Sequence, residues 1–327
     1  MMTDLSASVA VALFNGSPYL LAQLNSLAAQ TRPPCEIVIA DDGSSDDSLR
    51  LVQQWANDSL IPVTVLECAG RLGYAQNFSR AIAACKGDVV FLCDQDDWWF
   101  PHKIDVVMQT LEADPDAMLV LNDAEFADSS LRPLGVTKIE QFRRAGLSLD
   151  AYVMGCCMAL RRSFCDFALP MPDEALAHDC WLSDLARITG TRRIHCEVLQ
   201  YYRRHGANAS VALFNRVTPI SRLDVLVNGV RHLYGGESFD LRHRAAHDQV
   251  VFARASMPLP DRLEQAQERV NIQLDSLRKQ LELSERRLML RRLPLCRRFI
   301  TGAAMHFHLR ASGGGLGPFV KDLFGNP

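Results

Sequence analysis

The chain has none of the glycine-rich motifs that hold nucleotide phosphates on backbone amides. Neither G-x-G-x-x-G nor G-x-x-x-x-G-K-[ST] occurs in its 327 residues, which excludes a P-loop and the usual dinucleotide-binding turn. No apolar run is long enough to cross a bilayer as a helix. We therefore expect any bound nucleotide to be held by side chains rather than by a backbone cradle.

The chain also has little net charge and no paired cysteine spacing. Its 35 Lys and Arg against 38 Asp and Glu leave a net charge of −3, which gives no support to nucleic-acid binding. The 10 cysteines include no repeated C-x-x-C pair, so a zinc site lacks its usual spacing. We expect reduced, mostly buried thiols. The start of the chain has an early acidic residue and no basic segment, so we predict no secretory signal and a cytoplasmic protein.

The first hundred residues alternate between two hydrophobic periods. Short apolar runs are typical of buried strands, and apolar residues spaced three and four apart are typical of helices. This alternation with short connections predicts an α/β fold with a mostly parallel sheet flanked by helices. The expected strands are residues 8–14, 36–40, 61–66 and 88–93, and the expected helices are residues 18–30, 44–57 and 74–85. Further along, we expect strands at 117–121, 156–160 and 198–202 and a helix at 180–189.

Polar clusters follow three of the expected strands. They are Asn15-Gly16, Asp41-Asp42-Gly43 and the run from Asp94 to Asp97. Ligands of such sheets bind at the carboxyl ends of the strands, so one crevice could collect all three clusters. The acidic run predicts a site for Mg²⁺ or Mn²⁺, because a cation offsets the repulsion among its carboxylates. The alternative is a solvated turn with one helix-capping aspartate, a role that suits Asp97.

Four segments in this order resemble a known family. Asn15-Gly16, EIVIADDGSSDDS, RLGYAQN and CDQDDWWFP are together similar to family 2 glycosyltransferases with the GT-A fold, over about residues 8 to 210. The later HDCW and YRRHGAN are most similar to bacterial rhamnosyltransferase-like members. The resemblance implies an inverting, metal-dependent enzyme that moves a sugar, rhamnose among the candidates, from a dTDP- or UDP-sugar to a saccharide or lipid-linked glycan during surface polysaccharide synthesis.

The resemblance also implies residues that bind the donor. Asp42 corresponds to the aspartate that accepts the N3–H of the pyrimidine base, with Asp41 beside it and Asn15 near the nucleoside. A carboxylate suits this task because uracil and thymine present a donor there. The alternative for the two aspartates is a turn and helix cap. Arg71 and Asn77 correspond to residues near the diphosphate and ribose, although Arg71 could equally be an ordinary surface arginine.

The remaining implied residues concern the metal and the chemistry. Asp96 is the expected principal metal ligand, and Asp94 is expected to reach the ribose or a metal-bound water. His205 is implied as a further metal ligand or diphosphate contact, the alternative being an unspecialised loop histidine. Asp179 in HDCW is the expected general base for the acceptor hydroxyl. Its alternative is a simple helix cap. His178 replaces the usual acidic first residue of that motif and is assigned no catalytic role.

The character of the sequence changes near residue 217. We therefore divide the chain into a GT-A domain, residues 1–216, and a helical C-terminal region, residues 217–327, with expected helices at 222–233, 241–255 and 263–292. Leucines near heptad spacing in the last helix suit a hairpin or a dimer seam. Interleaved arginines and apolar residues between 286 and 310 suit peripheral contact with the inner face of an anionic membrane. Packing of this segment on the catalytic domain is the alternative.

Two other functional classes remain open at this stage. A metal-dependent nucleotidyltransferase or phosphohydrolase would also use carboxylates at strand ends, but it gives no reason for HDCW. A catalytically degenerate transferase domain could serve as an assembly module of a glycan synthase. Release of a nucleoside diphosphate rather than pyrophosphate separates the leading hypothesis from the first alternative, and turnover separates it from the second.

Overall fold

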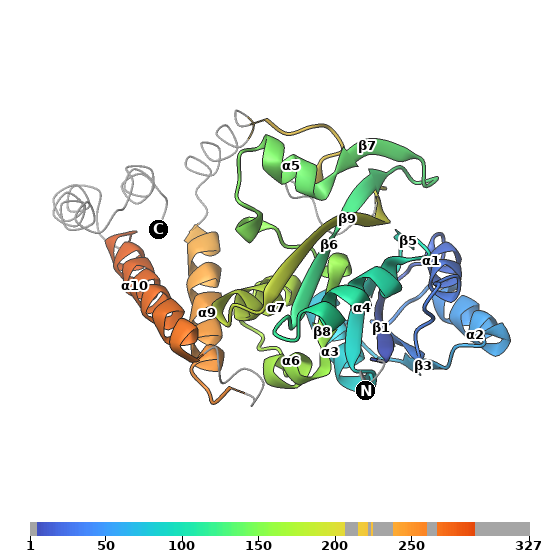
Figure 1. Ribbon diagram of the computed structural model, residues 1–327, viewed down its shortest axis with the longest axis horizontal. Coiled ribbons are helices and arrows are strands. Elements are labelled where there is room, and N and C mark those ends of the chain that lie inside the picture. The colour runs from blue at the N-terminus through green and yellow to red at the C-terminus, as the bar shows by residue number, and fades with distance from the viewer. Residues whose placement is uncertain (1–4, 207–214, 222–223, 225–237, 260–266, 292–327) are drawn as a thin grey trace.

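The computed structural model describes residues 5–206, 215–221, 224, 238–259 and 267–291. Its centre is a nine-stranded sheet in the order β3-β2-β1-β4-β8-β6-β9-β5, with β7 paired to β6. Figure 1 shows this sheet between two layers of helices, with the last two helices extending to one side.

The first part of the sheet has the predicted parallel strands. Each strand is followed by a helix that crosses to the next, and β1 lies between β2 and β4 with both neighbours parallel to it. The strands and helices are β1 (Ala7–Leu13), α1 (Leu20–Ala28), β2 (Glu36–Asp41), α2 (Ser48–Asp58), β3 (Val63–Leu66), α3 (Tyr74–Ala84) and β4 (Val89–Asp94). The prediction for this half is therefore confirmed in number, order and direction.

The second part of the sheet is mixed, which corrects the expectation of a mostly parallel sheet. Strand β8 (Met158–Arg161) lies antiparallel to both β4 and β6 (Leu119–Ala127). Strand β9 (Arg192–Arg203) is parallel to β6 but antiparallel to the short β5 (Trp98–Trp99).

The rest of the second half includes several elements that the sequence analysis passed over. The helix at 180–189 and the strands at 156–160 and 198–202 are present as α7 (His178–Ile188), β8 and the much longer β9. The elements not predicted are β5, β7 (Pro133–Thr137), α4 (Lys103–Ala113), α5 (Lys138–Arg144), α6 (Arg162–Ala168) and two short 3-10 turns at Leu149–Ala151 and Gly155–Cys157.

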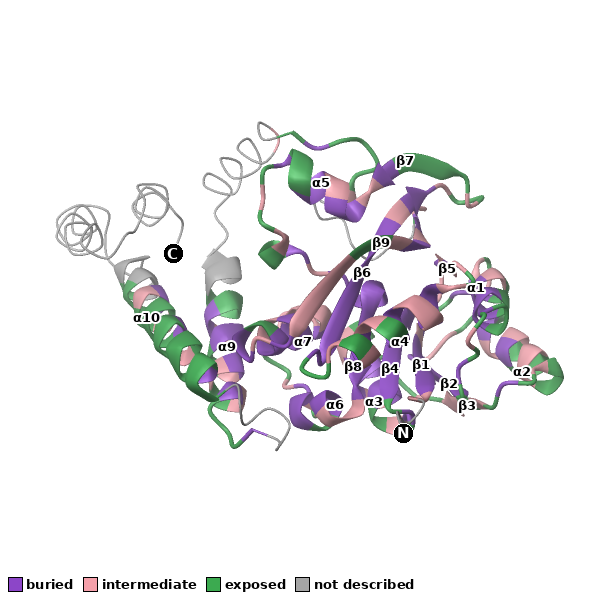
Figure 2. Ribbon diagram, viewed as in Figure 1, coloured by how far each residue is buried: buried purple, intermediate pink, exposed green. Residues whose placement is uncertain are grey.

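The core consists of one apolar layer on each face of the sheet. In β2, Ile37 and Ile39 join the layer under α1, α2 and α4, whereas Val38 and Ala40 join the layer under α3, α6 and α7. Successive residues of a strand point to opposite faces, and because both faces are covered the strand is apolar throughout. Figure 2 shows the resulting continuous burial along the central strands. Each fully buried aliphatic side chain contributes about 1.5–3 kcal/mol.

The C-terminal helices pack on the same core. Helices α9 (Ser238–Ala255) and α10 (Gln267–Arg291) contribute the buried residues Val251, Ala255 and Val270 to the layer that contains α7. The heptad-spaced Leu277 is also buried there. This side of α10 therefore faces α9 of the same chain, as in a helical hairpin. The proposed boundary near 217 and the possible self-association stay predictions.

Part of what was predicted for this region cannot be followed in the structure. Nearly all of the expected helix at 222–233, and residues 292–327 of the arginine-rich segment, lie outside the described residues. Membrane contact by that segment stays a prediction. Within the described ranges, every helix is too short or too polar to pass through a bilayer.

Candidate active site

The carboxyl ends of β1, β2 and β4 bring the predicted site residues to one edge of the sheet. In the strand register, Leu13 of β1 pairs with Asp41, and Ala12 pairs with Asp94 on the other side. The two acidic clusters therefore flank the end of β1, as the sequence analysis expected from the parallel topology.

The four residues from Asp94 to Asp97, at the end of β4, have different roles. Asp97 is fully buried and accepts hydrogen bonds from Gln200 Nε2 at 2.9 Å and from the backbone N–H of Arg203 at 3.2 Å. Gln95 holds the end of β1, because its Nε2 donates to Phe14 O and its Oε1 accepts from Phe14 N. A Cβ on Gly16 would lie 2.5 Å from that Oε1, so glycine is needed there. Gln95 and Asp97 fix the turn and leave Asp94 and Asp96 for the crevice.

Asp96 lies in direct contact with His205. The Nε2 of His205 is 2.8 Å from Asp96 Oδ2, and both side chains are mostly buried, with 9% and 14% of their area exposed. Tyr19, from the loop after β1, stacks on the His205 ring with 4.4 Å between centroids. The structure thus joins the two residues that the sequence analysis named as metal ligands, although they are 109 positions apart.

Asp94 is surrounded by groups that disfavour its charge. Burial, then the neighbouring carboxylates of Asp96 and Asp179, raise the pKa of Asp94 to about 7. The Cys156 thiol hydrogen bonds to it and acts in the opposite direction. The charge of Asp179 thus acts on Asp94, which indicates that the two carboxylates lie near one another.

This set of side chains fits a divalent cation. Carboxylate oxygens and one imidazole suit Mn²⁺ and, less well, Mg²⁺. Mutually repelling carboxylates at a partly buried site are stabilised when a cation neutralises them. A second group, Asp94, Asp97 and Cys156, has ligand atoms within 4.8 Å of one another. We favour the Asp96–His205 side, because the oxygens of Asp97 already accept two hydrogen bonds and burial keeps the Cys156 thiol protonated by raising its pKa.

A buried lysine lies beneath the acidic turn. Lys103 of α4 is 1% exposed, and its Nζ contacts Gln200 Oε1, lies 3.1 Å from Cys156 O and lies 3.8 Å from the centroid of the Trp99 ring. Burial lowers the pKa of Lys103, and the neighbouring thiols and Asp97 act against that shift. Its charge and its link through Gln200 to Asp97 support the acidic turn from below.

Backbone amides fill most of the acceptor positions of Asp41 and Asp42. Asp41 Oδ2 accepts from the N–H groups of Gly43 and Ser44, both at 3.0 Å, as the capped-turn alternative required. Its Oδ1 is buried without a hydrogen-bond partner among the described residues. Asp42 accepts from Leu72 N at 2.6 Å and Gly73 N at 3.0 Å. Asp42 thereby holds the 71–73 loop against the end of β2.

Asn15 organises the loop opposite this turn. It has a positive φ of 47°, a conformation that asparagine tolerates better than most residues. Its Oδ1 accepts from the N–H groups of Ser45 at 2.8 Å and Asp46 at 3.3 Å, and its own N–H donates to Ser44 Oγ. The side chain is exposed at the crevice edge, so its amide nitrogen is available to a ligand.

Arg71 and Asn77 occupy different environments. Arg71 is 68% exposed, stacks 4.1 Å from the centroid of the Phe14 ring and lies 3.9 Å from Asp42. Asn77 is 1% exposed, and its Nδ2 donates to Ala40 O at 2.6 Å and Leu13 O at 3.4 Å. Arg71 is exposed, and its contact with a diphosphate stays a prediction. Asn77 lies below the crevice and joins the ends of β1 and β2, so it supports the site without presenting a donor to it.

The N-terminus of α7 brings Asp179 to the crevice. Its Oδ1 accepts from the N–H of Cys180 at 2.8 Å. The adjacent His178 is buried, stacks on Phe78 at 4.2 Å and has no hydrogen-bond partner for either ring nitrogen among the described residues. Burial lowers the pKa of His178, with Asp179 acting against it. A Cβ on Gly155 would lie 2.3 Å from its Nε2, so a glycine at 155 makes room for this ring.

Several residues that shape the site were not found from the sequence. They are Tyr19, Gln95, Lys103 and Gln200, together with Arg80, whose guanidinium donates to Leu66 O and Glu67 O at the end of β3. Lys103 had a usable signal, because the apolar residues that follow it have helical spacing and place it at the start of α4. The others act through contacts between distant segments, which no local pattern reveals.

The fold is that of GT-A glycosyltransferases. The structure of residues 1–349 of S. aureus TarS in complex with UDP superposes with a TM-score of 0.54 at 17% identity, covering 86% of this chain and 91% of that one. Identity at this level shows a shared fold alone. The α/β sheet with flanking helices and a helical C-terminal region is therefore the architecture that the resemblance implied.

Residues 8–167 match the sequence model of Glycosyl transferase family 2. An uncharacterized glycosyltransferase of Nostoc sp. is 28% identical over 216 residues, which are 62% of this chain and 65% of that protein. The Escherichia coli enzyme WfaP, a UDP-Glc:alpha-D-GlcNAc-diphosphoundecaprenol beta-1,3-glucosyltransferase, is 24% identical over 212 residues, which are 64% of this chain and 82% of WfaP. The chain spans less than two thirds of several curated relatives, from 65% of one to 36% of another.

Proposed function

We propose that this protein is an inverting, metal-dependent glycosyltransferase that moves a sugar from a UDP- or dTDP-sugar to a saccharide acceptor. The observation that carries the proposal is the convergence of Asp94, the Asp96–His205 pair and Asp179 at the strand ends beside the Asp41–Asp42 turn. The family match supports the reaction class. Rhamnose and lipid-linked acceptors belong to the proposal as candidate substrates, and the WfaP name supports the lipid-linked class.

The donor would lie across the end of β1. In this arrangement the pyrimidine base binds near Asp41 and Asp42, where the unpartnered Asp41 Oδ1 is an acceptor for its N3–H. Arg71, exposed and stacked on Phe14, would contact the diphosphate. Tyr19 holds the His205 ring against Asp96. In this arrangement the anionic part of the donor would lie beside the candidate metal ligands.

Asp96 and His205 would hold Mn²⁺ or Mg²⁺, with Asp94 reaching the ribose or a metal-bound water. When bound, the cation supplies positive charge that stabilises the departing nucleoside diphosphate. Asp179 would accept the proton of the acceptor hydroxyl, which attacks the sugar from the face opposite the diphosphate. His178, the residue before Asp179, is packed against Phe78.

The test of this proposal is a panel of UDP-, dTDP-, GDP- and ADP-sugars, dTDP-rhamnose included, assayed with Mn²⁺ or Mg²⁺ and saccharide acceptors. We expect metal-dependent release of UDP or dTDP, and weaker calorimetric binding of GDP and ADP than of the pyrimidine diphosphates. Release of pyrophosphate would identify a nucleotidyltransferase instead. Binding of donors without any turnover would favour the degenerate assembly module.

A further inference from the structure

His247 of helix α9 connects the C-terminal helices to the segment that carries Asp179. It is fully buried, and its ring makes one contact with each of two parts of the catalytic region. Nδ1 lies 3.2 Å from the backbone N of Leu176, and Nε2 lies 3.1 Å from Asp184 Oδ2. A backbone N–H can only donate, so Nδ1 is an acceptor and Nε2 carries the proton that it donates to Asp184.

The position of Leu176 gives the first contact its consequence. Leu176 is three residues before Asp179, and the N-cap of α7, Ala177, has no side chain that could cap the helix. The start of α7 is therefore set by contacts from outside. On the other side of this loop, Gln76 Nε2 donates to Met171 O at 3.3 Å and to Asp173 Oδ1 at 2.9 Å. The loop is held between α3 and α9.

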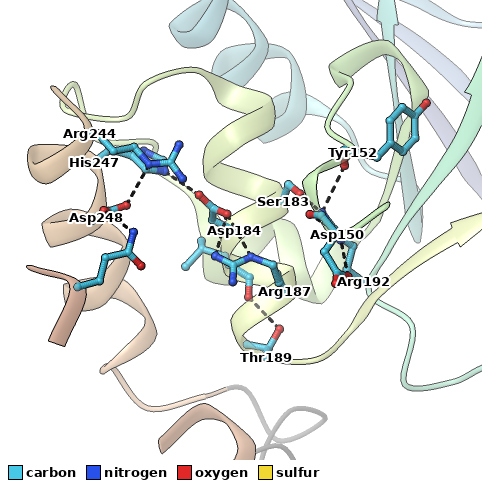
Figure 3. A network of polar contacts seen from close by, with 12 residues as sticks. Asp150, Tyr152, Ser183, Asp184, Arg187, Thr189, Arg192, Arg244, His247 and Asp248 are labelled. Atoms are coloured by element: carbon cyan, nitrogen blue, oxygen red, sulfur yellow. Dashed lines mark hydrogen bonds and ion pairs between the residues drawn. The ribbon is translucent and has the colours of Figure 1, made fainter. Parts of the chain in front are cut away.

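The second contact belongs to a polar network that Figure 3 shows between α7, α9 and α10. Asp184 accepts from His247 and also pairs with Arg187 at 3.1 Å. Asp248 in turn lies 3.6 Å from Arg244 and 3.5 Å from Gln280 of α10. Burial alone would raise the pKa of Asp184, but the hydrogen bond from His247 and the charges of Arg187 and Arg244 outweigh it and lower the pKa. The network fixes α9 on the face of α7 and thereby fixes His247.

We propose that His247 is a positioning residue for Asp179, acting through its hydrogen bond with Leu176, and that α9 is therefore part of the catalytic unit. This inference rests on the proposed function for the role of Asp179. It assigns to the C-terminal region a task within the active site, in addition to any contact with a membrane or a second chain. Misplacing a reacting group by about 1 Å can cost roughly a hundredfold in rate, so a remote hydrogen bond is sufficient for such an effect.

Three substitutions separate the two contacts of the ring. His247→Asn keeps an acceptor near the position of Nδ1, and His247→Gln keeps a donor near the position of Nε2, whereas His247→Ala removes both. If the Leu176 contact positions Asp179, His247→Asn should recover most of the activity that His247→Ala loses, and His247→Gln should recover little. If His247 only anchors α9 through Asp184, the order of rescue should be the reverse.

The matched control is Arg254→Ala. Arg254 also joins α9 to the catalytic region, since its guanidinium donates to Phe167 O at 3.0 Å and to Leu169 O at 3.2 Å. These carbonyls lie before the loop that His247 contacts. We expect this variant to lower the midpoint of thermal unfolding, as His247→Ala does, without changing the kcat of transfer.

Two properties of these variants are measured on the full chain: hydrogen–deuterium exchange and turnover. Hydrogen–deuterium exchange of peptides covering residues 171–180 should become about tenfold faster in His247→Ala and His247→Gln, because one hydrogen bond of roughly 1.4 kcal/mol is lost. Exchange over β1 and β4 should stay unchanged. Turnover of the best donor of the panel should fall by about tenfold to a hundredfold in kcat, with the donor KM unchanged.

The proposal is overturned if His247→Gln restores both measurements, or if Arg254→Ala lowers kcat as much as His247→Ala. Unchanged exchange in His247→Ala would also refute it. If the proposed function itself is wrong, the result is different, because the wild type would then release no nucleoside diphosphate from any donor. In that case the exchange data would still report the contact with Leu176, but the role assigned to Asp179 would be wrong.

Discussion

Asp41 and Asp42 follow β2, and Asp94 and Asp96 follow β4, so the two acidic pairs lie on either side of the end of β1. The first pair accepts four backbone N–H groups, from Gly43, Ser44, Leu72 and Gly73. The second pair has a different set of neighbours. A thiol lies beside Asp94, and the ring of His205 lies beside Asp96.

This difference shows that adjacent carboxylates at one sheet edge can have opposite roles. Charge-assisted hydrogen bonds from backbone amides stabilise a carboxylate and hold a loop in place. Carboxylates that instead face one another disfavour their own charge, as the raised pKa of Asp94 shows. The first pair therefore has a structural role in the loops after β2, and the second is the pair that a cation would stabilise.

The largest expected effect is at Asp96. Replacing it with Asn should lower the rate of transfer by about 10³- to 10⁴-fold, because several kcal/mol of stabilisation by a bound cation are lost. The fold should survive, since the new side chain has the same shape and relieves repulsion with Asp94. Turnover at limiting Mn²⁺ measures the loss of activity, and circular dichroism measures whether the fold survives. Near-normal turnover would mean that the metal is held elsewhere.

The second-largest expected effect is at Asp179, where replacement with Asn should lower kcat by about 10²- to 10³-fold. Removing a general base slows the attack of the acceptor hydroxyl. The contacts of the nucleotide sugar, at the other end of the site, are not changed. Donor affinity, measured by calorimetry with Mn²⁺, should therefore hardly change. An equal loss of donor affinity would move Asp179 to the donor side.

Asp42→Ala should destabilise the folded state by about 1–3 kcal/mol, because the partly buried N–H groups of Leu72 and Gly73 lose their acceptor. Urea unfolding of metal-free protein measures this change. Asp47→Ala is the matched control from the same loop: its pair with Arg50 is exposed, so its loss should change the stability much less than the loss of Asp42. Asp94→Asn, at the other cluster, should cost nothing or stabilise. Similar losses at Asp42 and Asp94 would contradict the contrast between the clusters.

The smallest expected effect is the stabilisation of the resting protein by the metal. At ten times its dissociation constant, Mn²⁺ should add about 1.4 kcal/mol to the free energy of unfolding. Asp96→Asn and His205→Ala should abolish this gain, while Asp128→Asn, at a partly exposed aspartate in a different turn, should keep it. Equal stabilisation of wild type and Asp96→Asn would show that the ion binds to another group.

The chemical character of the site and half of the sheet could be predicted from the sequence. The buried strands β1, β2 and β4 are short apolar runs that end in polar residues, and parallel strands align those ends without further information. The later strands were harder, because β5 has two residues and β9 is largely polar along its first half. Their positions depend on partners such as Gln200 and Asp97, which lie 103 residues apart.

The residue types at the ends of the strands follow from the amino-acid sequence alone, because hydrophobic period and turn residues are local properties of the chain. How each of them is used depends on contacts between distant segments. Asp97 and Asn77 turn inward because buried polar groups must find partners, whereas Asp96 meets His205 through the return of β9. The contact of His247 with Leu176 joins segments 71 residues apart, and a contact of that range is set by how helices pack on a common core, not by any pattern within either segment.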